Sequence, residues 1–465
     1  MHAVPGLATL AIALSAAASP LASQQAAAAP SGFEVPVTYD SLGNGLRYVL
    51  SEDHTAPKVI IAVYYNIGFR IEPRDRTGFA HLFEHLMFQG SGNLGKMEFI
   101  KLVQQNGGVL NGSTRFDFTN YFEILPSHKL ETALWAEADR MSGLAITEES
   151  LKNQQDVVKN EVRVNVLNQP YGGFPWIDLP MTANENWHNA HNFYGELDDL
   201  DAATLEDARD FFRKYYSPNN AVVVVRGDFQ PDSARAWIEQ YFGGIARVER
   251  TPLPDLTEPR QEEEKRARRT DSLATRPAIA FAWHMPERNS PEYYAMGLIS
   301  QILLEGNDSR LYQALVQEHG LTGNVSGGIN LLGNMFNYSG PMLLIGSAFY
   351  DDSAQESKIL TVVDSVVNQL QTTAVDSATL GRAVVKMRSN LYDHMGSFYG
   401  FGVADLLAAF ALFDDDPARI NEIEEEFRKV TPELIQRTAQ EYLRTGNRTV
   451  YVIDPAAAPR QEATP

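Results

Sequence analysis

Residues 204–225 read TLEDARDFFRKYYSPNNAVVVV, and residues 431–452 read TPELIQRTAQEYLRTGNRTVYV. A Thr, a Glu two residues later, a Tyr, an Asn and two Val stand at the same places in both stretches. In each stretch the Thr and Glu begin a helical pattern that runs to the Tyr, and a β-branched strand follows the Asn. A pattern that recurs in this way indicates a duplicated unit, so we predict two domains of similar fold.

Other segments extend the pattern through both halves of the chain. Apolar strands are expected at residues 59–65 and 278–283, and helices are expected at residues 95–106, 148–167, 309–317 and 378–392. At 465 residues, the chain also exceeds the roughly 250–300 residues that one hydrophobic core supports. The predicted fold class is α+β, with two homologous α/β domains, each a mainly antiparallel sheet packed with helices.

A charged linker is expected between the two domains. Residues 247–273 contain three prolines followed by the run EEEKRARR, with few apolar residues. Such a stretch between periodic apolar segments is typical of an exposed connection. It divides the chain into an N-terminal domain at 31–246 and a C-terminal domain at 274–465. The alternative is a charged surface helix within one domain.

The first thirty residues have the pattern of an export signal. Residues 3–18 are apolar and rich in Ala and Leu, and small residues that a signal peptidase could cut follow them. The apolar stretch is too short to cross a bilayer, and no later stretch looks long and uncharged enough to do so. We therefore expect a signal peptide at residues 1–30, a periplasmic or secreted protein and no membrane span. Because the segment before the apolar stretch holds His2 and no Lys or Arg, an Ala-rich tail is the alternative.

Composition limits the chemistry that the chain can perform. Its 39 Lys and Arg against 59 Asp and Glu give a net charge of −20, which repels phosphates, so no nucleic acid is expected as a partner. The absence of cysteine removes thiol catalysis and every Cys-based zinc site. A metal site in this chain would have to use His, Asp and Glu.

The residues most informative about function are His81-Leu82-Phe83-Glu84-His85. Their surroundings contain no Pro and are largely apolar, which predicts a helix. Positions i and i+4 of a helix lie one turn apart on one face, so the two imidazoles can bind one Zn²⁺. Glu84 shares that face, where a carboxylate can accept a proton from a metal-activated water. This H-x-x-E-H order is the reverse of the commoner H-E-x-x-H zinc motif. The competing interpretation is a helix whose partly buried histidines bond to a carboxylate.

Two histidines need a third protein ligand to form a catalytic zinc site. A second helical pattern downstream contains Glu161, but periodicity does not favour Glu161 over Asp156 or Glu148. His188 and His191 form another pair in an Asn-rich stretch, where no third ligand is evident. A second metal is not expected there.

The motif and the residues after it resemble the pitrilysin, or insulinase, family of zinc peptidases. The resemblance rests on His81 to His85, on Glu161 within DVVKNE and on NQPYG at 168–172, and it extends over nearly the whole chain after residue 30. In layout the chain is similar to the catalytic subunit of two-domain bacterial enzymes related to the mitochondrial processing peptidase. The resemblance implies one Zn²⁺ per chain, with His81, His85 and Glu161 as ligands and Glu84 as general base. It also implies a C-terminal domain without a metal site.

The same resemblance bears on residues 107–114, which read GGVLNGST. Family members align a substrate peptide on an edge strand at this place, so the resemblance implies that Asn111, Gly112, Ser113 and Thr114 bind substrate. Asn111 would bond to the substrate main chain. Without the resemblance, the two glycines favour an ordinary turn into a core strand.

Some residues depart from the family pattern. Members that act alone or as homodimers carry an Arg and a Tyr seven residues apart in the C-terminal domain. The corresponding residues here are Val316 and Gly323, which cannot donate side-chain hydrogen bonds to a substrate. Gln154 replaces a Glu of several relatives, which should leave the three ligands able to bind metal.

These departures suggest how the chain is used. We predict a zinc metalloendopeptidase that hydrolyses peptides or unfolded segments as the catalytic subunit of a heterodimer. A homologous zinc-less subunit would supply the missing Arg and Tyr. The alternatives are a non-catalytic peptide-binding or assembly subunit and a self-sufficient homodimeric peptidase.

Overall fold

The computed structural model of the protein describes residues 34–456. In it the valine-rich segment of the first repeat copy forms strand β6 (Ala221–Gly227), which lies inside a six-stranded sheet. The other strands of that sheet are β1 (Thr38–Ser41), β2 (Arg47–Glu52), β3 (Lys58–Tyr65), β4 (Val109–Thr114) and β5 (Thr119–Pro126). Their order is β1-β2-β6-β3-β5-β4. Strands β2 and β6 pair in parallel, and the other neighbours pair antiparallel. The expected export signal at residues 1–30 lies outside the described residues.

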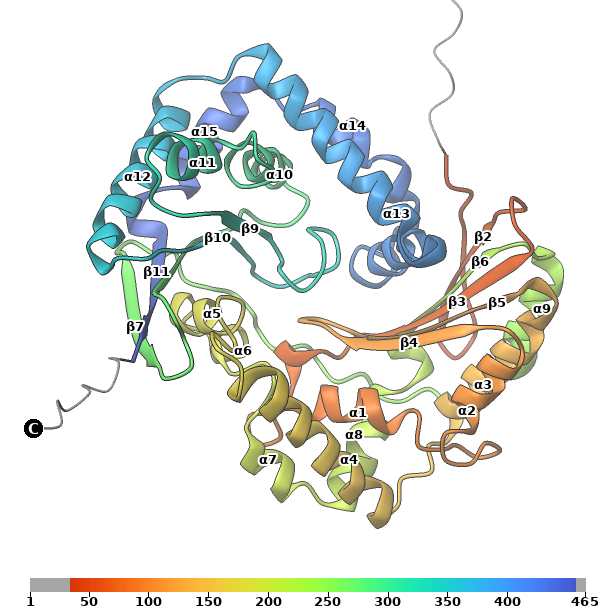
Figure 1. The fold of residues 1–465 in the computed structure, drawn as a ribbon. Helices are drawn as coiled ribbons and strands as arrows, with labels where there is room; N and C mark the ends of the chain where they lie inside the picture. The colour runs from red at the N-terminus through yellow and green to blue at the C-terminus, as the bar shows by residue number, and fades with distance from the viewer. Residues whose placement is uncertain (1–33, 457–465) are drawn as a thin grey trace, which may run out of the picture. The chain divides into compact units, whose positions relative to one another are not determined.

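The second repeat copy ends in β11 (Arg448–Pro455), which occupies the same place in a five-stranded sheet. The other strands are β7 (Lys265–Asp271), β8 (Ala278–His284), β9 (Val325–Ile329) and β10 (Leu343–Phe349). Their order, β7-β11-β8-β10-β9, repeats β2-β6-β3-β5-β4, and again a single pair, β7 with β11, is parallel. The prediction of two similar, mainly antiparallel sheets is confirmed (Figure 1).

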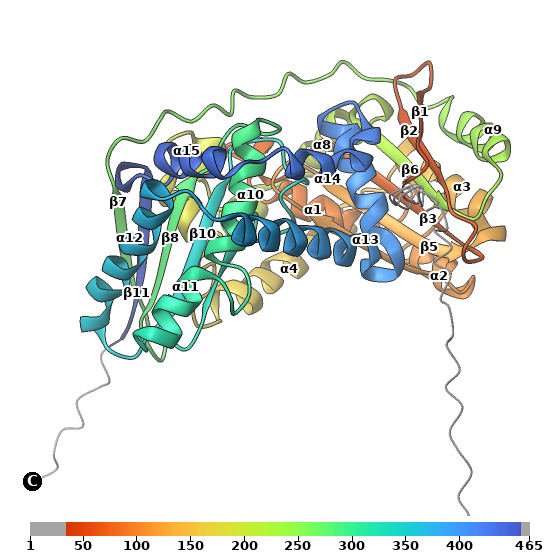
Figure 2. The same ribbon diagram turned by 90° about the horizontal axis from the view of Figure 1, so that it is seen from above.

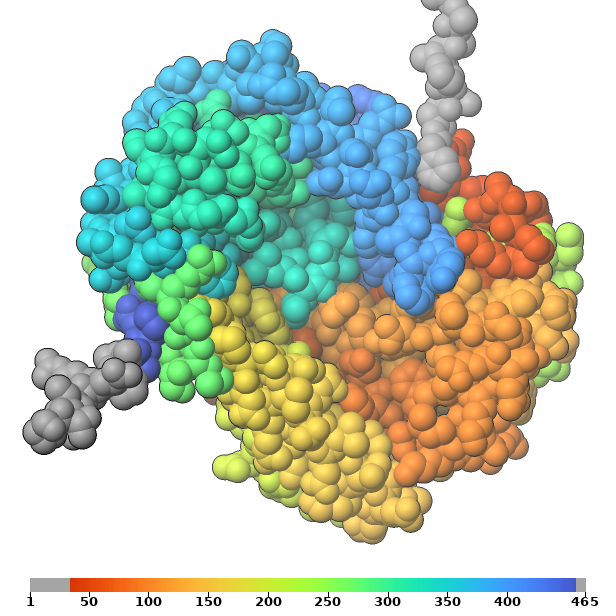
Figure 3. Space-filling view, in the orientation of Figure 1, coloured from red at the N-terminus to blue at the C-terminus, as the bar shows by residue number. Residues whose placement is uncertain are grey.

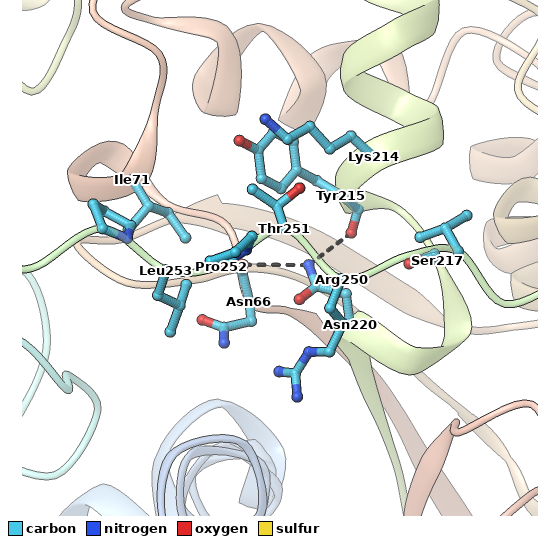
Figure 4. Close-up of a pocket in the computed structure, with 12 residues that line it drawn as sticks. Asn66, Ile71, Lys214, Tyr215, Ser217, Asn220, Arg250, Thr251, Pro252 and Leu253 are labelled. Atoms are coloured by element: carbon cyan, nitrogen blue, oxygen red, sulfur yellow. Dashed lines mark hydrogen bonds between the residues drawn. The ribbon is translucent and has the colours of Figure 1, made fainter.

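The Asn of the repeat holds the turn between helix and strand in both halves. The Asn220 side-chain amide donates to the carbonyl of Tyr215 at 2.9 Å and to that of Asn66 at 3.3 Å (Figure 4). In the second half the amide of Asn447 donates to the carbonyl of Tyr442 at 2.7 Å. A short side chain that satisfies a carbonyl at a helix end explains why Asn stands here in both copies.

Helices from the first half cover one face of the first sheet. That face packs against α1, α3, α8 and α9 through alternate strand residues such as Ile61, Val63 and Tyr121 (Figure 1). The helices on this side are α1 (Phe79–Leu86), α2 (Glu98–Gln105), α3 (Leu130–Ser142), α4 (Glu148–Val162), α7 (Leu197–Ala202), α8 (Leu205–Tyr215) and α9 (Pro231–Phe242). The helix expected at 148–167 is therefore α4, continued to residue 167 by a π-helical turn.

The other face of the first sheet is covered by a helix from the second half of the chain. The distal part of α13 (Ser377–Phe413) packs on β3 and β6. Phe401 stacks on Phe122 with a ring distance of 3.7 Å, and the Tyr64 hydroxyl donates to the buried carboxylate of Asp405 at 2.7 Å. The first sheet thus depends on residues distant in sequence to cover one of its two faces.

A helix of the first half likewise covers part of the second sheet. Helix α5 (Asp178–Ala183) of the first half packs on the second sheet through Leu179 and Ala183, and α6 (Trp187–Ala190) follows it. The other helices of the second half are α10 (Pro291–Leu303), α11 (Arg310–Tyr312), α12 (Glu356–Thr372), α14 (Ile423–Arg428) and α15 (Pro432–Tyr442). Because each half buries apolar surface on the other, the two halves share their cores.

Helix α13 is broken near its middle, where Phe398, Tyr399 and Gly400 have φ values of 44°, 60° and 89°. A Cβ at Gly402 would lie 1.7 Å from the carbonyl oxygen of His394, so only glycine fits where the helix resumes. By length and composition α13 could cross a membrane, which corrects the expectation that no later stretch would qualify. However, 61% of its apolar window is buried inside the protein, so α13 is a core helix here.

The connection between the halves is shorter than predicted. Residues 246–262 have no regular secondary structure, and Figure 2 shows this segment as an extended trace leading to β7. The predicted linker ran to residue 273, but residues 265–271 form β7. Strand β7 lies at the sheet edge, with side chains that alternate between more and less exposed positions. An edge strand tolerates charged residues because one of its sides is exposed. Strand β7 is therefore rich in charged residues, as an exposed linker would be.

We predict that Tyr64→Phe destabilises the protein through the contact between β3 and α13. The substitution removes a donor from the buried Asp405 carboxylate, which costs about 1–3 kcal/mol. Thermal unfolding followed by circular dichroism should therefore show a lower midpoint. The control is Tyr241→Phe, which removes an exposed hydroxyl bonded to Glu131 and should shift the midpoint little. Equal midpoints for the two variants would contradict the prediction.

Candidate metal centre and active site

Helix α1 is held at its first turn by two carboxylates. Glu72 is buried and accepts hydrogen bonds from the main-chain N–H groups of Gly78 at 2.9 Å and Ala80 at 2.5 Å. Asp199 on α7 accepts from the main-chain N–H of Thr77 at 3.1 Å. Carboxyl oxygens at the start of a helix satisfy N–H groups that have no acceptor within the helix. These contacts hold α1 in the orientation that presents its motif.

Helices α1 and α4 bring three metal-ligating side chains together. The Nε2 atoms of His81 and His85 lie 3.3 Å apart. The Glu161 carboxylate lies 3.7 Å from Nε2 of His81 and 3.4 Å from Nε2 of His85. Two nitrogen ligands about 2.05 Å from one tetrahedral ion are about 3.3 Å apart, so these residues fit a Zn²⁺ site. Among residues 34–456 they are the one group of three such side chains whose ligand atoms all lie within 4.8 Å.

The protonation states of this cluster favour metal binding. Burial, and next the charge of His85, lower the pKa of His81 to about 4, so its imidazole is neutral at physiological pH. The hydrogen bond with His85 lowers the pKa of Glu161, which keeps that carboxylate ionised. Neutral imidazole and ionised carboxylate are the forms that bind a cation. The Nδ1 atom of His81 is buried without a hydrogen-bond partner among the described residues, so packing orients this ring.

Glu84 lies beside these side chains on α1 and is held by the neighbouring strand. Its Oε2 accepts a hydrogen bond from the Thr114 hydroxyl at 2.8 Å. Burial raises the pKa of Glu84, while the Thr114 hydrogen bond and the charges of His85 and Arg115 act in the opposite direction. A carboxylate whose pKa is raised toward neutrality exchanges protons more readily in general acid–base catalysis.

Strand β4 runs past Glu84 at the edge of the first sheet. Because no strand within residues 34–456 pairs with its outer side, the main-chain groups there are available to another extended chain. Thr114 and Gly112 lie on the side of Glu84, and a Cβ at Gly112 would be 3.4 Å from Glu84 Cγ. The edge strand therefore brings a free main-chain edge close to the candidate base.

The other two residues predicted to bind substrate have partners within the sheet. The Asn111 side chain is exposed and accepts from the main-chain N–H of Gly112 at 3.0 Å. The Ser113 hydroxyl donates to the Asn120 side chain at 2.5 Å. A substrate role for Asn111, Gly112, Ser113 and Thr114 stays a prediction.

Tyr194, in the loop between α6 and α7, is a neighbour of the cluster that sequence analysis did not single out. Its ring lies 5.6 Å from the ring of His81 and 5.2 Å from that of Trp176. Burial raises the pKa of Tyr194, and the negative charges of Glu161 and Glu84 raise it further. No periodicity marks this residue, because tertiary packing alone brings its loop to α1.

Arg115 was also missed, although it directly follows the predicted substrate strand. Within the described part of the chain, its guanidinium makes a single weak hydrogen bond, 3.5 Å long, to the carbonyl of Thr114. No carboxylate of the described residues pairs with it within 4.0 Å. The only signal in the sequence was its position next to the GGVLNGST stretch.

Other candidate ligands lie apart from the cluster. Asp156 forms ion pairs with Lys152 and Lys159, each at 3.2 Å. His188 and His191 bond through their ring nitrogens to main-chain carbonyls at 2.8 and 3.0 Å. Neither histidine belongs to a group of three potential ligands within residues 34–456.

The second half has a cavity where the first half has its ligand cluster. The cavity, of ≈ 390 Å³, is lined by α10, β9 and α13, which correspond to α1, β4 and α4 of the first half (Figure 3). Its polar lining includes Ser300, Gln301, Glu305 and His394. Of the described residues in the second half, none forms a group of three metal ligands. The duplicated scaffold therefore carries the candidate centre in one copy.

Comparison with known families agrees with this geometry. The model described as "Insulinase (Peptidase family M16)" matches residues 47–171, which include the motif of α1 and Glu161. The model described as "Peptidase M16 inactive domain" matches residues 202–386. The chain belongs to peptidase family M16. The resemblance to the pitrilysin, or insulinase, family is thus confirmed.

Individual proteins similar to this M16 chain cover most of its length. The zinc protease PqqE of Helicobacter pylori is 25% identical over 419 residues, which are 89% of this chain and 92% of that protein. The crystal structure of a protease from Helicobacter pylori has a TM-score of 0.82 at 24% identity and covers 91% of this chain and 100% of that one. The periplasmic protease PqqL from Escherichia coli has a TM-score of 0.72 at 15% identity, covering 90% of this chain and 47% of that one. The two solved structures show the fold that this M16 chain shares with them.

We predict that Glu72 makes the stability of this M16 chain depend on pH. Burial raises the pKa of Glu72 to about 8. Because this value lies above that of an unfolded Glu, the contribution of Glu72 to stability is present in acid and is lost as pH rises through about 8. Thermal midpoints between pH 5 and 9 should therefore fall more for the natural chain than for Glu72→Gln. The control is Glu249→Gln at an exposed position, and an unchanged pH slope in Glu72→Gln would contradict the prediction.

Proposed function

We propose that this chain is a zinc endopeptidase that hydrolyses peptide bonds in peptides or unfolded segments. The observation that carries the proposal is the cluster of His81, His85 and Glu161, whose ligand atoms all lie within 4.8 Å, beside the carboxylate of Glu84. Similar proteins that are named zinc proteases support zinc as the cofactor. A single such cluster among the described residues supports one ion per chain.

The residues of the cluster divide the chemistry among them. His81, His85 and Glu161 would hold the ion, which when bound acts as a Lewis acid toward the scissile carbonyl and a water molecule. Glu84 takes the proton from the attacking water and passes it to the leaving amine. The Thr114 hydroxyl bonds to Oε2 of Glu84 and so leaves Oε1 free to receive the proton.

An extended peptide is the form of substrate that suits β4. The strand has a free edge beside Glu84, and main-chain pairing along residues 111–114 would align a peptide there. Recognition of this kind reads the main chain more than the side chains. A folded protein offers few free strands, so we expect folded proteins to be poor substrates.

We further propose that the chain is the catalytic subunit of a heterodimer. Val316 packs, partly buried, against the core of the second half, and neither Val316 nor Gly323 has a side-chain donor. The match of residues 202–386 to the model of an inactive M16 domain supports a second half without an active site of its own. A homologous zinc-less subunit carrying an Arg and a Tyr would supply the groups that these positions lack.

A periplasmic or secreted location is proposed from the apolar, Ala-rich sequence of residues 3–18. The Escherichia coli protein that shares the fold is a periplasmic protease, which is consistent with that location.

We predict that Glu84→Gln abolishes hydrolysis and leaves zinc bound. The amide cannot accept the proton, so the rate on quenched fluorescent peptides should fall by at least about 10²–10⁴-fold. Zinc content measured by mass spectrometry should stay at one ion per chain, whereas His81→Ala should lose the ion. Retained turnover in Glu84→Gln, with Glu249→Gln as the exposed control, would refute the role of Glu84.

We predict that strong peptidase activity requires the zinc-less homologous subunit. The purified mature chain should be nearly inactive alone and active after that subunit is added, with a mass in size-exclusion chromatography equal to one copy of each. Strong activity from the chain alone, at a mass of two copies, would instead indicate a homodimer. Peptide binding without hydrolysis in both preparations would favour a non-catalytic subunit.

A further inference from the structure

Hydrolysis of a peptide bond builds negative charge on the carbonyl oxygen, and a preorganised donor aimed at that oxygen raises the rate by about 10²–10³-fold. Within this chain we propose that Tyr194 is such a catalytic residue, with its hydroxyl donating a hydrogen bond to the oxygen of the scissile carbonyl. The proposal rests on the peptidase function proposed above. It adds a donor from the zinc-binding half to any that a partner subunit supplies.

The Tyr194 hydroxyl is free to act. Other hydroxyls near the cluster are engaged, since that of Thr114 donates to Glu84, that of Ser113 to a neighbouring strand and that of Tyr121 to a main-chain carbonyl. The Tyr194 hydroxyl has no hydrogen-bond partner among residues 34–456, and its oxygen is not fully buried. An incoming carbonyl oxygen would therefore displace only water from it.

Tyr194 also lies close to the candidate metal ligands and the candidate base. Its ring is 5.6 Å from the ring of His81, and among the charged groups that act on its hydroxyl the carboxylates of Glu161 and Glu84 have the largest effects. The hydroxyl is thus a neighbour of both the candidate ligands and the candidate base. A substrate held at Glu84 would bring its reacting carbonyl into the same small region.

The loop that carries Tyr194 is joined to the start of α1 by close main-chain contacts. A Cβ on Gly195 would lie 2.3 Å from the main-chain nitrogen of Gly78, so only glycine permits this approach. The N–H of Glu196 donates to the Thr77 hydroxyl at 2.9 Å. Because Tyr194 is tied to the helix that bears the zinc motif, its hydroxyl keeps a constant position relative to the reacting groups.

Two rival roles for the residues around the cluster lead to different outcomes. The Tyr194 ring lies near the rings of both His81 and Trp176, so its sole role could be to orient His81. Such a role needs the ring and not the hydroxyl, and it would survive in Tyr194→Phe. The second donor nearby is the weakly bonded guanidinium of Arg115, which could bond to the carbonyl oxygen in place of Tyr194.

The test uses the full chain loaded with zinc and the variants Tyr194→Phe and Arg115→Ala. Tyr241→Phe is the matched control, because it removes an exposed hydroxyl bonded to Glu131 at 2.9 Å. Zinc content, kcat and KM on quenched peptides are measured, with the zinc-less subunit added where activity requires it. Calorimetry then compares a phosphinic peptide, which mimics the charged tetrahedral state, with the corresponding amide peptide in a Glu84→Gln background.

We expect Tyr194→Phe to keep its zinc, its KM and its affinity for the amide peptide. Its kcat and its affinity for the phosphinic peptide should each fall by about 10²-fold, because the lost hydrogen bond forms only as charge develops. Tyr241→Phe should match the natural chain.

Natural values of kcat and phosphinic affinity in Tyr194→Phe would overturn the proposal. A loss of zinc in that variant would overturn it as well, since the ring environment and not the donor would then matter. A defect in Arg115→Ala without one in Tyr194→Phe would assign the donor to Arg115. If the zinc-loaded natural chain neither cleaves peptides nor binds the phosphinic peptide, the peptidase function itself fails, and this proposal fails with it.

Discussion

The packing of α4 across α1 is the contact on which the candidate site depends. It brings Glu161 within 3.4 Å of His85 and 3.7 Å of His81, although the two helices are separated in sequence by α2, β4, β5 and α3. Burial lowers the pKa of His81 to about 4, so the pair of imidazoles is not doubly charged at physiological pH. The neutral imidazole of His81, the His85 nitrogen and the ionised carboxylate of Glu161 converge at ligand distances and form a site suited to a divalent cation.

The surroundings of α1 explain why this geometry holds. Glu72 and Asp199 bond to the first turn of the helix, and Thr114 bonds to Glu84 from the edge strand. Both faces of the first sheet are packed, while no strand of residues 34–456 pairs with the outer edge of β4. A rigid base and a free strand edge are therefore combined at one place, which is the combination that cleavage of an extended peptide requires.

Several features could be read from the sequence because they depend on local patterns. The repeated Thr, Tyr and Asn act within one helix–turn–strand unit, and Asn220 and Asn447 make the same bonds in each copy. The i, i+4 spacing of His81 and His85 likewise needs only a helix. Strand β7 was mistaken for linker because its charged composition reflects an edge position, which only the finished sheet reveals. Tyr194 and Glu72 were missed because their roles arise from contacts with α1 and not from any period in their own segments.

The sequence by itself determined the duplicated fold and the H-x-x-E-H motif, since both are carried by residue types at fixed spacings. Periodicity left Glu161, Asp156 and Glu148 equivalent, and only the family resemblance favoured Glu161. Only the tertiary structure placed Glu161 against the two histidines and paired Asp156 with Lys152 and Lys159. The tertiary structure alone also decided that each half supplies a helix to the sheet of the other, and that the Tyr194 ring lies beside His81. These contacts join segments that are far apart in the chain, and the packing of the whole core sets their relative positions.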